Sequence, residues 1–66
     1  MKEWIPTTDR LPDYYISVLV YVPDEHPLIA VKEAYLANGA FHTKSWIYHI
    51  HEIPHWMPMP DAPKEV

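Results

Sequence analysis

Five histidines in a chain of 66 residues are the first candidates for chemistry, because imidazole is the commonest metal ligand in proteins. They are His26, His42, His49, His51 and His55. A strand through this region would place the rings of His49 and His51 on one face, about 6 to 7 Å apart. Such a pair could hold Zn²⁺ if His42, His55 or Glu52 supplied a third ligand. A solvated strand face is the simpler interpretation. We therefore expect neither a metal nor a cofactor, and keep His49 and His51 as weak metal candidates.

Two tryptophans stand near opposite ends of the chain, each close to prolines. Buried against each other or against a sheet, Trp4 and Trp56 would each bury about 150–250 Å² and enlarge a small core. Exposed, they would form an aromatic and proline-lined groove for a partner. The core role is favoured for the tryptophans themselves, and the surface formed by the two ends is the candidate binding site. Its tentative residues are Trp4, Arg10, Tyr14, Tyr15, His55, Trp56 and Met57.

Arg10 is the only arginine in the chain. Its planar guanidinium suits bidentate contact with a carboxylate or a phosphate. Because it lies between Asp9 and Asp13, a surface ion pair or a turn-stabilising contact is the more ordinary role. Tyr14 and Tyr15 follow directly and add aromatic surface of the kind enriched at protein interfaces.

The sequence contains few of the residue combinations that are typical of enzyme active sites. The chain has no cysteine and one glycine, which excludes disulfides, a thiol nucleophile and a glycine-rich phosphate loop. Its two serines, Ser17 and Ser45, do not lie in a nucleophile-elbow motif. A single short chain also has difficulty enclosing a pocket of about 300 Å³. We therefore expect a protein that is not an enzyme.

The balance of charged residues narrows the range of possible binding partners. Nine carboxylates against five Lys and Arg give a net charge of −4, whereas nucleic-acid binding requires clustered cations to neutralise phosphates. The first six residues hold no signal-peptide core, and no apolar run approaches the ~18 residues that span a bilayer. We expect a soluble protein of the cytoplasm that binds neither nucleic acid nor membrane. Homo-oligomerisation would compensate for the small core of so short a chain.

Eight prolines divide the chain and leave two proline-free windows, residues 13–22 and 28–53. In the first window, residues 16–22 are β-branched or aromatic and apolar on both faces, which predicts a central strand. In the second, residues 28–37 fit either a short helix with Asp24 as N-cap or a strand that ends at a type I′ turn, Asn38-Gly39. The strand is favoured, because another β-like run, 40–43, follows the turn at once.

Residues 46–55 also favour a strand, with His49 and His51 on one face. The tail 56–63 is expected to be extended and outside any ladder, because its alternate prolines lack amide donors. The chain is therefore predicted to be one small domain, residues 1–66, and mostly β, although a small α+β fold is possible. We expect an antiparallel meander of three to four strands, wrapped by extended Pro- and Trp-rich termini, with at most one short helix.

Four segments together resemble the domain of unknown function 551 family: Trp4-Ile5-Pro6, Arg10-Leu11-Pro12, Val18-Leu19-Val20-Tyr21 and His55-Trp56-Met57-Pro58-Met59-Pro60. Thr7 and Met59 stand where that family often has Val and Leu. The resemblance spans residues 4–60, implies an origin in bacteriophages or prophages, and favours the strand over residues 28–37. It implies no reaction.

Two functional hypotheses follow. The first is a phage or prophage accessory protein of the bacterial cytoplasm that binds a host or phage protein through the aromatic and proline-lined surface. The second is an oligomer that sequesters a small anionic or nucleotide-like ligand between protomers, with stacking aromatics and Arg10 or histidines on its phosphate.

Overall fold

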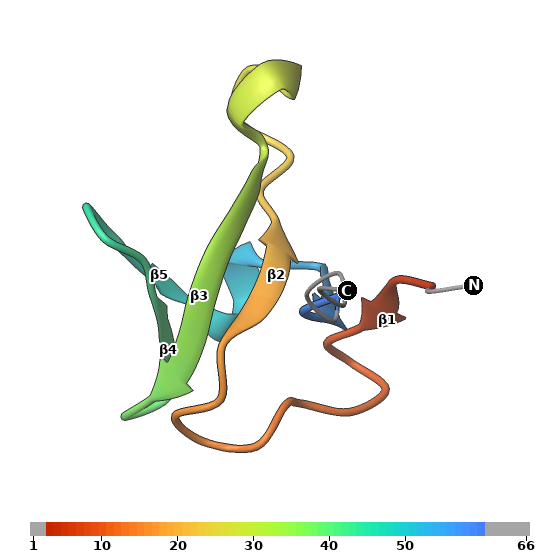
Figure 1. The fold of residues 1–66 in the computed structure, drawn as a ribbon, viewed down its shortest axis with the longest axis vertical. Helices are drawn as coiled ribbons and strands as arrows, with labels where there is room; N and C mark the ends of the chain where they lie inside the picture. The colour runs from red at the N-terminus through yellow and green to blue at the C-terminus, as the bar shows by residue number, and fades with distance from the viewer. Residues whose placement is uncertain (1–2, 61–66) are drawn as a thin grey trace, which may run out of the picture.

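The structure is a computed structural model that describes residues 3–60 of the chain. These residues form one six-stranded antiparallel sheet with two 3₁₀ turns (Figure 1). The strands are β1 (Ile5–Pro6), β2 (Val18–Tyr21), β3 (Val31–Ala37), β4 (Ala40–His42), β5 (Ile47–His49) and β6 (His55–Pro58), and the turns are η1 (Pro27–Ile29) and η2 (Ile50–Glu52). The mostly β prediction is confirmed, and no helix within residues 3–60 is long and apolar enough to cross a membrane.

The strands follow the order β1-β6-β2-β3-β4-β5. The predicted central strand is confirmed, although it is shorter than expected: β2 covers Val18–Tyr21 and lies between β3 and β6. The consecutive strands β2 to β5 form the expected meander. Alternate residues of β2 are buried because its inner face packs into the core, while Leu19 and Tyr21 belong to the outer face.

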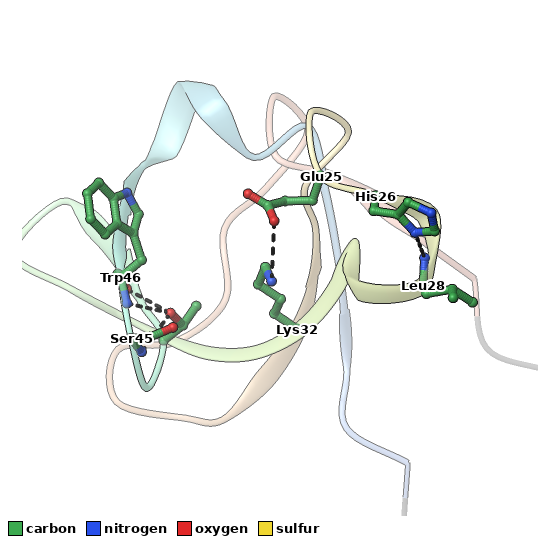
Figure 2. Close-up of polar contacts among 7 residues, drawn as sticks. Glu25, His26, Leu28, Lys32, Ser45 and Trp46 are labelled. Atoms are coloured by element: carbon green, nitrogen blue, oxygen red, sulfur yellow. Dashed lines mark hydrogen bonds and ion pairs between the residues drawn. The ribbon is translucent and has the colours of Figure 1, made fainter.

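The alternative left open for residues 28–37 is resolved in favour of a strand, since β3 covers Val31–Ala37. Asn38 (φ 53°) and Gly39 (φ 75°) both occupy the left-handed region, as a type I′ turn requires. They connect Ala37 directly to its partner Ala40. The residues before β3 form the 3₁₀ turn η1, in which the Leu28 amide donates to the His26 side chain over 3.1 Å (Figure 2).

The strand predicted across residues 46–55 is interrupted. β5 ends at His49, and η2 turns the chain before β6 begins. The Glu52 carboxylate folds back and accepts a hydrogen bond from the His49 amide over 3.1 Å. Because the chain turns here, His49 and His51 do not lie on one strand face as expected.

The two proline-rich segments are extended, but the expectation that residues 56–63 lie outside any ladder is wrong for residues 56–58, which belong to β6. Residues 61–63 lie outside the described residues. β6 pairs with β1 on one side and β2 on the other. Strand alternation explains why the prolines do not prevent this. The amides of His55 and Met57 point toward β2. At position 58 an amide would point away from β2, so Pro58 costs no hydrogen bond between β6 and β2. Pro6 similarly lacks an amide on the outer edge of β1, where no strand pairs within the described residues.

The core lies on the inner face of the curved sheet. Its most buried large side chains are Val20, Leu36, Phe41 and Ile53. Trp56, 5% exposed, joins this cluster from β6, and its Nε1–H donates to the Arg10 carbonyl over 2.9 Å. The Thr7 hydroxyl donates to the Ile53 carbonyl over 2.7 Å. These two bonds attach the N-terminal segment to the C-terminal one.

Replacing Trp56 by phenylalanine should lower the free energy of unfolding by about 1–3 kcal/mol, because the ring becomes smaller and the Arg10 carbonyl loses its donor. Urea unfolding followed by circular dichroism measures this. The matched control is Trp46→Phe, at a side chain that is 64% exposed. It should change stability by no more than about 0.5 kcal/mol. Equal effects of the two substitutions would contradict a structural role for Trp56.

Burial raises the pKa of the Tyr48 hydroxyl above its ordinary value of 10.0, and the charges of Glu25 and Glu52 raise it further. Between the unfolded pKa of about 10 and the higher folded pKa, only the folded state keeps this proton, so stability falls as the pH rises through that window. Urea unfolding at increasing alkaline pH should therefore show a smaller loss of stability for Tyr48→Phe than for the wild type. Parallel losses would refute the shift.

Candidate functional site

A row of aromatic side chains crosses the outer face of the sheet. Tyr14 contacts Tyr15 edge-on, with ring centroids 6.2 Å apart. Tyr15 stacks on Tyr35 of β3 at 6.2 Å, and Tyr35 stacks on His42 of β4 at 5.2 Å with only 11° between the ring planes. We call these four residues the aromatic row. The three tyrosines are exposed and His42 is half-buried, so the row forms part of the molecular surface.

The register of the hairpin brings the row together. Tyr35 and His42 are direct cross-strand partners, and His42 is in turn the partner of Ile47 on β5. Residues directly opposite each other in an antiparallel pair share a face. The His42 Nε2–H donates to the Ala37 carbonyl over 3.0 Å, which fixes the ring over its own hairpin. The row therefore continues across the sheet to the exposed Ile47 side chain.

Tyr15 is held in an unusual backbone conformation. Its φ of 65° lies in the left-handed region, which is uncommon for a residue with a large side chain. Its amide donates to the Leu36 carbonyl over 3.0 Å, and Tyr14 forms a bridge to Leu36. Its ring nevertheless stays 69% exposed, so little burial compensates for the strain. Strained residues of this kind concentrate at functional sites.

A groove with a volume of about 630 Å³ lies beside the row. One wall is the Lys32–Tyr35 part of β3, the other is the stretch from His42 to Ser45, and Ser17 also lines it. The β4–β5 turn that forms the second wall is fixed by Thr43, whose hydroxyl accepts from the Trp46 amide over 3.0 Å and donates to the Trp46 carbonyl over 2.8 Å (Figure 2).

The structure divides the tentative binding residues into separate groups. Tyr14 and Tyr15 belong to the aromatic row. Trp56 is buried, with the Arg10 guanidinium 5.6 Å from its ring centroid, so the indole is part of the core rather than of a binding surface. Trp4 packs edge-on against Tyr21, with centroids 6.2 Å apart.

His55 and Met57 are both half-buried on β6, as cross-strand partners of Tyr21 and Leu19. The two tryptophans thus do not pack on each other. A hollow between the two terminal segments is lined by Pro12, Trp56 and Pro58, among others, but by neither Trp4 nor His55. Arg10 covers an aromatic ring, and the ion pair found within residues 3–60 joins Lys32 and Glu25 instead, over 3.9 Å.

The histidines do not converge. His49 and His51 stack with ring centroids 5.4 Å apart and nearly parallel planes. In the part of the chain that the structure describes, no group of three or more His, Cys, Asp or Glu side chains is placed to hold a metal ion. His42, considered as a third ligand, is part of the aromatic row.

Sequence reasoning did not select Tyr35, Trp46, Ile47 or Lys44 as binding residues, and it named His42 individually only as a possible metal ligand. A signal for Tyr35 and His42 was present, because a two-residue turn at Asn38-Gly39 sets them opposite each other. The contact of Tyr15 with Tyr35 had no such signal, since it depends on the left-handed backbone of a residue that is neither Gly nor Asn.

The fold and the row define a small all-β domain with an exposed aromatic face. A family model with the description "Protein of unknown function (DUF551)" matches residues 3–64, and the chain belongs to this family. Comparison with curated proteins and with solved structures finds no match. The family description assigns no activity.

Tyr15→Asn should change the free energy of unfolding by less than about 1 kcal/mol, because Asn tolerates the left-handed backbone and this relief offsets the lost stacking. Tyr15→Val should be less stable than Tyr15→Asn by at least about 1 kcal/mol, since a β-branched residue is a genuine outlier at positive φ. Urea unfolding of both variants tests this. Equal stability of the two would show that the left-handed backbone carries no cost.

Proposed function

We propose that this chain is a non-enzymatic accessory protein of a phage or prophage, and that it binds a host or phage protein through its aromatic row. The observation that carries the proposal is Tyr15, whose ring is held on Tyr35 by a left-handed backbone. Tyrosine and tryptophan supply much of the binding energy at protein interfaces. The exposed side chains of Trp46 and Ile47 extend the same surface.

The ends of the sheet support binding through a face rather than through an outer edge. β1 is two residues long and contains Pro6, which offers no donor. At the other end, the Glu52 carboxylate already accepts from the His49 amide. Short strands, prolines and covered amides are the means by which proteins prevent edge-to-edge pairing. These features protect the edges of the sheet and leave the side chains on its outer face open to a partner.

The phage setting rests on the resemblance of the Trp4, Arg10 and His55 segments to the family. It supports the cytoplasm of a bacterial host as the proposed location. The charge of −4 argues against nucleic acid as the partner. The alternative of a small phosphate ligand is less favoured, because the side chain of Arg10 lies over Trp56.

The proposal is tested by photo-crosslinking in bacterial cells that carry the phage or prophage genome. A photoreactive phenylalanine derivative replaces Tyr14, which lies at the end of the row and is 58% exposed. We expect one defined covalent adduct with another protein, identified by mass spectrometry. We also expect this adduct to disappear when Tyr15→Asn and Tyr35→Ser are combined with the photoreactive residue.

The matched control carries the same derivative in place of Thr8, an exposed residue that follows β1 and is separated from β3 in the sheet order by β6 and β2. It should give no such adduct. Identical adducts from both positions, or an adduct that persists in the row variants, would refute binding through the aromatic row.

A further inference from the structure

The backbone of β3 has hydrogen-bonding groups on two sides, and alternation fixes which residue faces which neighbour. A two-residue turn makes Ala37 and Ala40 a hydrogen-bonded pair, so the odd-numbered residues of β3 face β4. The even-numbered positions face β2. Two bonds agree with this, because the Leu36 carbonyl accepts from Tyr15 and the Ala30 carbonyl accepts from Val22.

β4 covers only half of β3. Its register ends where Tyr35 pairs with His42, since the chain then enters the tight Thr43–Trp46 turn instead of continuing along β3. Figure 1 shows the β4–β5 hairpin lying against one end of β3 and diverging from the other. The amides and carbonyls of Val31 and Glu33 therefore point toward a side on which no strand of residues 3–60 pairs with them.

This unpaired stretch of β3 is one wall of the groove already described, which Lys32–Tyr35 and His42–Ser45 line. Its volume of about 630 Å³ is within the range of ligand-binding clefts. Lys44 lies on the opposite wall. Lys32 is paired with Glu25 (Figure 2). Lys44 is therefore the lysine of this lining that remains without an ion pair among the described residues.

We propose that the partner enters this groove as an extended peptide segment that adds a strand to β3 along Val31 and Glu33. This is the mode by which peptides join exposed sheet edges, where main-chain hydrogen bonds supply affinity and neighbouring side chains supply specificity. Lys44, in the β4–β5 turn, selects a peptide segment that carries an acidic side chain close to that turn. The aromatic row then contacts the same partner on the outer face. The inference rests on the proposed function and specifies how the partner is held.

Glu33→Pro tests the inference because the amide it removes faces the groove and not β2. Proline is tolerated at such edge positions, so the fold should persist. Glu33→Thr is the matched control, since it removes the same carboxylate but keeps the amide. The probe is the tightest-binding peptide selected from a pool of random linear peptides by the wild-type protein.

Its affinity for Glu33→Thr should equal or exceed that for the wild type, because the carboxylate removed lines the groove and repels an acidic peptide. Its affinity for Glu33→Pro should be at least about tenfold weaker than for Glu33→Thr, because one hydrogen bond is lost and the proline ring fills its place. The selected peptides should be enriched in acidic residues, and Lys44→Glu should remove that enrichment. Circular dichroism confirms that each variant is folded. If Glu33→Pro is unfolded, chemical synthesis of the chain with an N-methyl group on Glu33 removes the same donor.

Equal affinity of Glu33→Pro and Glu33→Thr for the peptide would overturn the inference, and so would a pool from which the wild type selects no peptide. The alternative occupant of the groove is a second copy of the chain, which light scattering would detect as a dimer. A wild-type dimer that dissociates in the Glu33→Pro variant would overturn the peptide proposal. None of these outcomes affects the crosslink from Tyr14, which tests the proposed function separately.

Discussion

The position of Trp56 between β1 and β2 is the contact on which the rest of the structure depends. The indole belongs to the buried cluster, donates to the Arg10 carbonyl over 2.9 Å and lies beneath the Arg10 guanidinium. A chain of 66 residues buries little surface on folding and has no disulfide. Its two proline-rich arms, the segments that contain β1 and β6, are therefore strands of the sheet. β6 pairs beside β2 rather than lying across the sheet.

This use of the arms explains which surfaces stay open. Pro6 and the Glu52–His49 hydrogen bond leave few donors at the outer edges of the sheet. The outer face carries the aromatic row, and β3 keeps an unpaired stretch because the Thr43 turn draws β4 away from it. An exposed aromatic face beside an unpaired backbone edge is a combination suited to holding another protein.

The sequence was sufficient for the mostly β fold, the central position of β2 and the Asn38-Gly39 turn, because each depends on local residue preferences and alternation. It was insufficient for the two arms. Whether the missing amide of Pro58 breaks a ladder depends on which neighbouring strand that amide would face, and this is set by partners distant in sequence. Similarly, the pattern favoured a core role for both Trp4 and Trp56, against each other or against the sheet, whereas strand alternation puts the two rings in different contacts.

Residue-resolved amide hydrogen exchange on the free protein tests the central claim most directly. The account predicts slow exchange at Trp56 and Met57, because β6 is paired on both sides. In β3 it predicts slow exchange at Lys32, Ala34 and Tyr35 and fast exchange at Val31 and Glu33, whose amides face no strand within residues 3–60. Fast exchange throughout β6, or protection of Val31 and Glu33 equal to that of Lys32 and Ala34, would contradict it.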